Sequence, residues 1–371
     1  MSPRTTPQTP PRDLYRRDRG DRMMRALTAF AESYAVATAR RAAKHPRRHP
    51  DSAAGDESTA LSLVVADRRQ NDDVAVLRLE SPDQHPLPPW QAGSHLDLDL
   101  PSGRRRQYSL CGDPGDRRGY TIAVRRIDGG DGGSTEVHTT LQPGSEVRVS
   151  VPRNAFPFAA DPAVLLIAGG IGITPLLPMA REAERLGLDW QLVYTGRTRA
   201  SLPLAAEVAA LDPERVDVRT DEEHGVPDAA ELLRRAPRGA AVYCCGPGPL
   251  LDAVRAAFDT AAAEGRLTAL HFERFAPAPI RDGRPFELQL ARSGAVLPVP
   301  ADRSALDVLR ERDPAVPYSC RQGFCGVCRQ RVLRGSVDHR DRRLGDGERA
   351  DGEMLVCVSR APEGERLVLD L

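Results

Sequence analysis

Residues 319–328 read SCRQGFCGVC, and they decide what the carboxyl-terminal part of the chain folds around. Four cysteines belong to the pattern: Cys320, Cys325, Cys328 and, further along, Cys357. Their spacing, C-x4-C-x2-C with a distant fourth cysteine, is the plant-type spacing of 2Fe–2S ferredoxins. Gly323 and Gly326 allow the loop to approach the bridging sulfides and to point backbone N–H groups at them. A structural zinc site is the alternative, although such sites favour two C-x2-C pairs.

The length and composition of the chain are those of a globular protein. The sequence has 371 residues, equal numbers of basic and acidic side chains (52 each) and seven cysteines. This length predicts two or three domains, and no stretch approaches the roughly 18 apolar residues of a transmembrane helix. Residues 1–20 are charged and Pro-rich, unlike a secretory signal. Seven cysteines are too few, and odd in number, for a disulfide scaffold, so we expect a reducing, cytoplasmic location without a transmembrane segment.

Residues 1–58 differ from the rest of the chain in charge. The first 50 residues hold twelve cations against four acids. Such an arm either binds an anionic surface or is solvated; because arginine is abundant throughout, we expect a solvated extension and no nucleic-acid partner. Over 21–43 a helical period of apolar residues runs through Met23, Leu27, Phe30, Tyr34 and Ala37. Such an amphipathic helix packs on its own neighbouring domain or docks onto a partner, and we favour the former.

Residues 59–160 alternate between apolar and polar side chains. Leu96, Leu98 and Leu100 are separated by aspartates, and Val147–Val151 shows the same period of two. Turns rich in Pro and Gly separate the stretches, for example QPGS at 142–145. The pattern predicts an antiparallel β-barrel.

Residues 161–275 change to strands that alternate with helices. The predicted strands are 163–168, 190–195, 216–220, 240–245 and 267–272. This alternation predicts βαβ units around a parallel sheet. Residues 276–284 form a linker by composition. The last region, 285–371, has an alternating strand at Phe286–Leu290, a helix over 305–312 capped by Ser304, and the cysteine pattern.

Two turns at the carboxyl ends of the predicted parallel strands suit a dinucleotide. LLIAGGIGITP at 165–175 joins a strand to a helix, with Thr174 as the expected N-cap and Pro175 as the first helical residue. Gly170 and Gly172 would allow a pyrophosphate to approach the backbone at the helix N-terminus. Many tight turns carry glycine, so this motif gains weight only from a second one.

The second motif, YCCGP at 243–247, ends another strand of the same sheet. Because ligands bind at the carboxyl ends of such strands, we expect Cys245, Gly246 and Pro247 beside the nicotinamide, and Cys244 as a small buried residue. Arg197 and Arg199 follow the strand at 190–195. They either bind the adenosine ribose or its 2′-phosphate, or are solvated.

One strand of the predicted barrel carries a cation, an aromatic ring and a hydroxyl. Arg106 and Tyr108 share one face, and Ser109 lies on the other. Further along, backbone and hydroxyl donors for an anion are expected from Ala123, Val124, Gly133, Ser134 and Thr135. This set suits a phosphorylated, planar cofactor. The alternative is a charged strand beside a flexible loop.

Several motifs in one order carry a family resemblance. They are RQYSL at 106–110, GGS at 132–134, PRNAFP at 152–157, AGGIGITP at 168–175, CGP at 245–247, HFERF at 271–275, SCRQGFCGVC at 319–328, DHRD at 338–341 and CVSRA at 357–361. From about residue 59 to the end, the chain resembles the phthalate dioxygenase reductase family, a branch of the ferredoxin–NADP reductase superfamily. The resemblance implies a flavin-binding β-barrel, a parallel α/β nicotinamide domain and a β-grasp ferredoxin domain, in that order.

The resemblance also implies roles for the matching residues. Arg106, Tyr108 and Ser109 would bind the flavin, with Ser109 near the flavin N5 atom, and Phe275 would lie against the isoalloxazine. Gly133, Ser134 and Thr135 would lie near its phosphate, which favours FMN over FAD. Gly170, Gly172 and Thr174 would bind NADH or NADPH, and Cys245 would flank the nicotinamide. Ser109 and Cys245 are therefore the expected catalytic pair.

The expected activity is electron transfer. A nicotinamide delivers two electrons as hydride and a 2Fe–2S cluster accepts one at a time, so a flavin is expected between them. We expect a monomeric NAD(P)H-dependent reductase that serves a separate oxygenase, most simply of the Rieske type. The alternatives are a haem monooxygenase as acceptor, direct reduction of a small molecule, and a metal-binding module without enzymatic activity.

Overall fold

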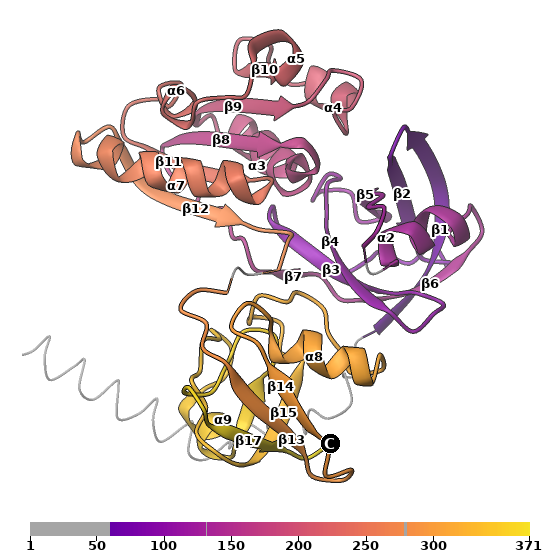
Figure 1. The fold of residues 1–371 in the computed structure, drawn as a ribbon. Coiled ribbons are helices and arrows are strands. Elements are labelled where there is room, and N and C mark those ends of the chain that lie inside the picture. The colour runs from indigo at the N-terminus through magenta and orange to yellow at the C-terminus, as the bar shows by residue number, and fades with distance from the viewer. Residues whose placement is uncertain (1–59, 131, 278–279) are drawn as a thin grey trace, which may run out of the picture. The chain divides into compact units, whose positions relative to one another are not determined.

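Three β-sheets and their helices make up the described part of the chain (Figure 1). The computed structural model describes residues 60–371 except 131 and 278–279. The basic extension over 1–58 and its predicted amphipathic helix lie outside the described residues. No helix in the described ranges is both long and apolar enough to cross a bilayer.

The first sheet is an antiparallel barrel, which confirms the prediction from the period of two. Its strands are β1 (Ala60–Asn71), β2 (Val74–Glu80), β3 (Ser94–Asp99), β4 (Arg105–Ser109), β5 (Gly119–Arg125), β6 (Glu146–Ser150) and β7 (Arg153–Asn154). The order β4-β3-β6-β1-β2-β5, with β7 paired to β3, is closed by a bridge between Leu110 and Ile122. Alternating apolar side chains such as Leu77 and Leu96 are fully buried in the interior. Helix α2 (Gly133–Thr140) lies between β5 and β6 in the sequence.

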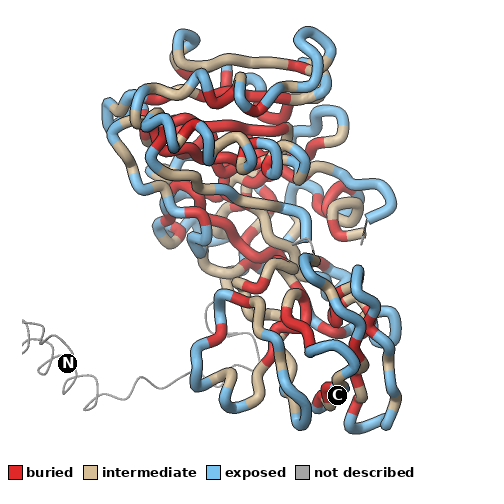
Figure 2. Tube along the Cα trace, turned by 60° about the vertical axis from the view of Figure 1, so that its left-hand side comes forward, coloured by how far each residue is buried: buried red, intermediate tan, exposed pale blue. Residues whose placement is uncertain are grey.

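The second sheet is parallel throughout, in the order β10-β9-β8-β11-β12. Its strands are β8 (Ala163–Gly169), β9 (Asp189–Gly196), β10 (Val216–Thr220), β11 (Ala240–Cys245) and β12 (Leu267–Glu273). Its helical segments are η2 (Gly170–Gly172), α3 (Ile173–Arg185), α4 (Ala205–Ala209), α5 (Asp221–His224), α6 (Ala229–Leu233) and α7 (Gly248–Ala263). Every residue of β11 is buried, because a central parallel strand is covered on both faces. Figure 2 shows buried segments running through the strands and exposed ones at the turns.

The helix after the glycine turn begins earlier than the sequence predicts. The 3-10 turn η2 leads directly into α3, so Gly172 is the N-cap and Thr174 lies inside the first turn. The expectation that Thr174 caps the helix and that Pro175 opens it is therefore wrong. The Thr174 hydroxyl instead donates to the Ile171 carbonyl at 3.0 Å. Pro175 is tolerated because N–H groups of the first turn have no acceptor within the helix.

The third sheet has the mixed topology of a β-grasp fold, in the order β14-β13-β17-β15-β16. Its elements are β13 (Phe286–Leu290), β14 (Val296–Val299), α8 (Ala305–Arg312), β15 (Arg329–Arg334), α9 (Asp346–Ala350), β16 (Glu353–Leu355) and β17 (Arg366–Leu369). β13 and β17 run parallel at its centre. Helix α8 starts where the sequence predicts, because Ser304 and Asp307 form a capping box.

A buried cation fastens the linker to the third sheet. Arg360 is 2% exposed, and burial lowers the pKa of its guanidinium. No carboxylate in the described ranges forms a salt bridge with it. Its Nη2 atom instead donates to the carbonyls of Arg284 and Pro300, and its Nη1 to that of Arg303, all within 2.9 Å. Three main-chain segments therefore depend on one side chain.

Replacing this cation is expected to destabilise the third sheet. In Arg360→Met three main-chain carbonyls lose the charged donor that a buried side chain supplies, which costs about 3 kcal/mol. For a domain of this size the loss corresponds to a fall of roughly 10 °C or more in the midpoint at which heating bleaches the cluster absorbance. Arg292→Met, at a side chain that is 75% exposed, is the control and should leave the midpoint nearly unchanged. Equal midpoints in the two variants would contradict this account of Arg360.

Candidate functional site

Ser109 and Cys245, the two predicted catalytic residues, are brought together by a third side chain. Cys245 and Glu273 are register partners at the carboxyl ends of β11 and β12. The Ser109 hydroxyl, at the end of β4, lies close enough to the Glu273 carboxylate to oppose the rise in its pKa. Ser109 and Cys245 are both buried. A barrel strand and two strands of the parallel sheet therefore meet at one point.

Glu273 was not predicted as a site residue. Its Oε2 atom is buried and has no hydrogen-bond partner among the described residues. Burial raises the pKa of Glu273 from 4.5 to about 8, although the nearby Ser109 hydroxyl opposes the shift. Burial, and then the charge of Glu273, also raise the pKa of the Cys245 thiol. The sequence signal is a carboxylate at the end of the otherwise apolar strand 267–272, opposite a strand that ends in Cys245.

The predicted flavin residues of β4 lie beside the start of α2. A Cβ atom on Gly133 would come within 2.5 Å of the Arg106 Nε atom, so the glycine lets this guanidinium lie against the helix N-terminus. No side chain caps that N-terminus. A guanidinium and free helical N–H groups fit a phosphate. Tyr108 is partly buried against the barrel core, and this burial raises the pKa of its phenol.

The other residues predicted near the flavin phosphate differ in whether their hydrogen-bonding groups are available to a ligand. The Ser134 hydroxyl accepts a hydrogen bond from the Ile127 N–H at 3.0 Å. Ala123 and Val124 are buried in β5 and pair with β2, and the Val124 carbonyl lies 2.9 Å from the His138 ring. Their backbone groups therefore already serve the barrel. Thr135 lies in the first turn of α2, beside the uncapped N–H groups.

The two glycine-containing turns of the nicotinamide site pack against each other. A Cβ atom on Gly172 would lie 2.1 Å from the Cys245 carbonyl oxygen and 2.8 Å from the Gly246 nitrogen. Gly172 is thus required for contact between the turns, and not only for the approach of a ligand. Gly170 adopts a positive φ of 54° in the same turn. Thr174 is buried with its hydroxyl occupied, so the structure does not bring that hydroxyl to the surface of the site.

Three further predicted residues are open to a ligand. Arg197 follows β9 and is exposed, and Pro247 is exposed at the start of α7. Phe275 follows β12 and is 44% exposed. An exposed aromatic ring at this point suits a flat partner, because covering it removes apolar surface from water.

The four predicted metal ligands form two pairs. The Cys320 thiol lies next to that of Cys325, and the Cys328 thiol lies next to that of Cys357. Over the described ranges, no three His, Cys, Asp or Glu side chains converge as ligands of a single ion. Two thiol pairs fit a two-iron cluster, in which each iron takes two cysteines. The arrangement therefore disfavours the zinc alternative.

The loop around the thiols is shaped by its glycines. Gly323 has a φ of +79°, and a Cβ atom there would lie 2.7 Å from the Val358 side chain and 3.1 Å from the Asp341 Cα. The Gln322 N–H points at the Cys320 sulfur, 3.3 Å away. Both features agree with a backbone that wraps closely around a cluster.

The cysteine loop also contacts the barrel next to Ser109. The rings of Phe324 and His95 meet edge to face, with centroids 6.3 Å apart, and His95 is the register partner of Ser109 on β3. Burial lowers the pKa of His95 to about 4, so its ring is neutral at pH 7. The Ser319 hydroxyl donates to the Asp97 carboxylate at 3.3 Å. The predicted flavin strand and the thiols are therefore neighbours.

Comparison with known proteins agrees with this arrangement. The model of the 2Fe-2S iron-sulfur cluster binding domain matches residues 288–362. Phthalate dioxygenase reductase of Burkholderia cepacia is 40% identical over 324 residues, covering 85% of this chain and 98% of that protein. The phenoxybenzoate dioxygenase subunit beta of Ectopseudomonas oleovorans is 42% identical over 306 residues, or 81% and 93% of the two chains.

The chain belongs to the phthalate dioxygenase reductase family. A solved structure of phthalate dioxygenase reductase, titled as a modular structure for electron transfer from pyridine nucleotides to [2Fe-2S], matches with a TM-score of 0.61, 38% identity, and coverage of 85% and 99%. An intact type IV self-sufficient cytochrome P450 monooxygenase matches equally well at 37% identity, over 84% of this chain and 41% of that longer one.

These findings confirm several predictions. The fold classes agree, and the chain is an NAD(P)H-dependent oxidoreductase that uses a flavin and a 2Fe–2S cluster. The metal-binding module without enzymatic activity is thereby excluded. The role of each individual site residue stays a prediction.

The two loop glycines of this reductase are expected to tolerate a methyl group differently. Both glycines have a positive φ, which an alanine tolerates poorly, but only Gly323→Ala adds a clash, 2.7 Å from the Val358 side chain and 3.1 Å from the Asp341 Cα. At Gly326 an added methyl group makes an ordinary contact with the Arg343 side chain at 3.7 Å. We expect Gly323→Ala to lose more than half of its iron and acid-labile sulfide, and Gly326→Ala to keep most of both. Equal iron contents would show that the close approach at Gly323 is not what holds the loop.

Burial of Glu273 is expected to make stability depend on pH. Its folded pKa exceeds the unfolded one, so this group destabilises the fold increasingly as pH rises from about 4.5 to about 8. Glu273→Gln removes the effect. The temperature at which half of the flavin is released should therefore be only slightly higher in Glu273→Gln than in wild type at pH 5. Above pH 8 it should be several degrees higher. Glu231→Gln, at a carboxylate paired with Arg219, is the control; the same difference at both pH values for Glu273→Gln would refute the assignment.

Proposed function

We propose that this reductase carries electrons from NADH over FMN and its cluster to a separate Rieske-type oxygenase. The observation that carries the proposal is the pairing of β3 with β4. Ser109 on β4 lies beside Glu273 at the predicted nicotinamide site, and its register partner His95 packs on Phe324 of the cysteine loop. One strand pair therefore adjoins both the entry and the exit of electrons.

The residues around this strand pair would hold the flavin and orient it toward the nicotinamide. A bound flavin supplies the conversion of a hydride into single electrons. Arg106 and the N-terminus of α2 suit the terminal phosphate of FMN, and the exposed Phe275 ring suits its isoalloxazine. Cys245 and the protonated Glu273 form a neutral wall at pH 7, which keeps charge away from the transferred hydride. The chain then needs to contribute position and the exclusion of water, with no acid or base acting on a substrate.

The charges beside Arg197 favour NADH over NADPH. Arg199 forms a 2.6 Å ion pair with Glu223, and the Glu222 N–H donates to the Arg197 carbonyl. Asp221 completes a run of three acids in α5. Three carboxylates lie beside two guanidinium groups, and the guanidinium of Arg199 is already paired. The excess negative charge would repel a 2′-phosphate.

An oxygenase is the acceptor that the names of the relatives favour. Phthalate dioxygenase reductase and the phenoxybenzoate dioxygenase subunit are components of dioxygenases by their printed names. A haem monooxygenase is the second candidate, because a self-sufficient cytochrome P450 contains a segment of the same fold at 37% identity. Direct reduction of a small molecule is the third.

The organisation of the chain is part of the proposal. We take 59–160 as the flavin domain, 161–275 as the nicotinamide domain, 276–284 as the linker and 285–371 as the ferredoxin domain, working as a monomer. A cytoplasmic location is supported by the four cluster thiols, which must stay reduced until iron binds.

Removal of one cluster ligand tests the order of the relay. Cys328→Ser should keep most NADH–ferricyanide activity, because the flavin still receives hydride, and should lose transfer to a protein acceptor by a factor of about 100 or more. Cys111→Ser, at a buried thiol of the barrel that bonds to a carbonyl, is the control for both assays. The same assays with NADPH should be slower. Undiminished transfer to the protein acceptor in Cys328→Ser would overturn the proposed order.

A further inference from the structure

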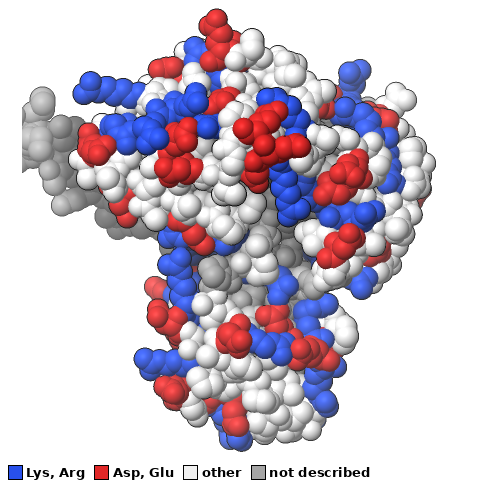
Figure 3. All heavy atoms as spheres, turned by 45° about the horizontal axis from the view of Figure 1, so that its top comes forward, with Lys and Arg blue, Asp and Glu red and all other residues white. Residues whose placement is uncertain are grey.

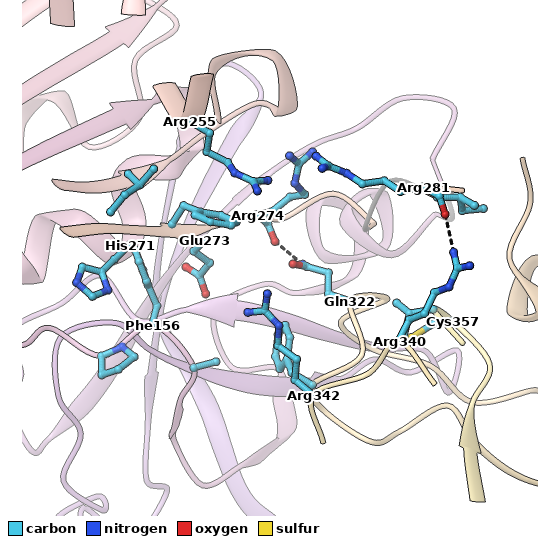
Figure 4. A pocket seen from close by; sticks show the side chains of 17 residues that line it. Phe156, Arg255, His271, Glu273, Arg274, Arg281, Gln322, Arg340, Arg342 and Cys357 are labelled. Atoms are coloured by element: carbon cyan, nitrogen blue, oxygen red, sulfur yellow. Dashed lines mark hydrogen bonds between the residues drawn. The ribbon is translucent and has the colours of Figure 1, made fainter. Parts of the chain in front are cut away.

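A cavity of about 790 Å³ lies beside the cysteine loop, apart from the predicted flavin and nucleotide residues. Its wall is formed by α7, the end of β12, the linker, the segment 155–157 that follows β7 of the barrel, and the loops around 322–324, 340–342 and 357–358 (Figure 4). None of the predicted flavin or nicotinamide residues lines it. Of the four cluster ligands only Cys357 does. The cavity therefore adjoins the candidate site at Glu273 and Phe324, and the cluster at Cys357.

Five guanidinium groups line this cavity. They belong to Arg255, Arg274, Arg281, Arg340 and Arg342. The only acidic residue in the lining is Glu273, whose carboxyl is protonated at pH 7 because burial raises its pKa to about 8. The cavity is therefore strongly positive. By contrast, basic and acidic side chains are interspersed over the face shown in Figure 3.

Three of the five cations have no ion pair in the described ranges. Arg274 pairs with Asp252 at 2.9 Å and Arg340 with Asp338 at 2.7 Å. The Arg255 guanidinium lies over the Phe272 ring, 4.9 Å from its centre. The side chains of Arg281 and Arg342 form no salt bridge with a described residue, although both are attached through their backbones, Arg281 by its carbonyl to Arg340 and Arg342 by its N–H to Gly323.

The abundance of arginine does not explain this grouping. Elsewhere in the described chain, exposed arginines such as Arg185, Arg199 and Arg366 have a carboxylate oxygen at 2.6 Å. Exposed arginines that form no salt bridge with a described residue, such as Arg331 and Arg334, do not line this cavity. Unpaired like charges around one cavity repel each other, so placing them together does not stabilise the folded state. An anion that enters the hollow reverses this, since guanidinium groups bind carboxylates in a bidentate manner.

We propose that the cavity is the docking site for an acidic surface of the acceptor protein, with Cys357 at the point of electron exit. The proposal rests on the proposed function, because it requires a protein acceptor. Each transfer oxidises the reductase by one electron and reduces the metal centre of the acceptor by one. Carboxylates of the acceptor would occupy the space between Arg255, Arg281 and Arg342. Charge of opposite sign also speeds the encounter of the two proteins.

A binding measurement tests this without turnover. The probe is a fluorescein-labelled hexaglutamate peptide, titrated with the intact holoenzyme at low ionic strength and followed by fluorescence anisotropy. We expect Arg255→Gln/Arg281→Gln/Arg342→Gln to bind the peptide about tenfold more weakly than wild type. The matched control is Arg312→Gln/Arg331→Gln/Arg334→Gln, which removes three exposed charges that do not line the cavity and should bind like wild type. Arg342→Gln alone serves where the triple variant folds poorly, and should weaken binding by about twofold.

Other outcomes overturn the proposal. The first is equal affinity of the two triple variants for hexaglutamate, and the second is that wild type binds a hexalysine peptide as tightly as hexaglutamate. The third is displacement of hexaglutamate by sub-millimolar inorganic phosphate, which would assign the cavity to a small free anion. Bleaching of the wild-type visible spectrum by NADH is recorded on the same preparation. If NADH bleaches it and the peptide test fails, only the docking site is wrong; if NADH leaves it unchanged, the proposed function fails first.

Discussion

The antiparallel pairing of β3 with β4 is the constraint on which the site depends. Residues opposite each other in such a pair have fixed neighbours, so a group beside Ser109 and a group packed on His95 stay close together. Here the first group is Glu273, from the parallel sheet, and the second is Phe324, from the cysteine loop. Three sheets of different topology are thereby brought to one short ladder without any of them entering the core of another.

The linker keeps the third sheet in this position through its backbone. The Arg340 guanidinium donates to the carbonyls of Arg281 and Asp282, and Arg360 to that of Arg284. Carbonyl groups are present at every residue, so this attachment places little demand on the linker's own side chains. Arg281 can therefore present its guanidinium to the cavity while its carbonyl serves the fold. Structural and recognition roles are separated within one residue.

The sequence predicted the features that are local. The switch from a period of two to strands alternating with helices located the barrel and the parallel sheet, and Ser304 marked the start of α8. The cysteine spacing identified the cluster because three of its four ligands, Cys320, Cys325 and Cys328, come from one loop. Glu273 was missed because its environment depends on Ser109, which is 164 residues away in the sequence. Thr174 was misjudged as a cap because a 3-10 turn, decided by contact with the Cys245 turn, starts the helix earlier.

The pairing of the thiols gives the relay a direction. Cys320 and Cys325 belong to the loop that contacts the barrel. The pKa of Arg105 on β4 is raised most by Asp99, and Cys325 lies near enough to contribute to this rise. Cys357 belongs to the other pair and lines the arginine cavity. The two halves of a cluster bound here would thus face different surroundings, one beside the flavin strand and the other beside a positive hollow.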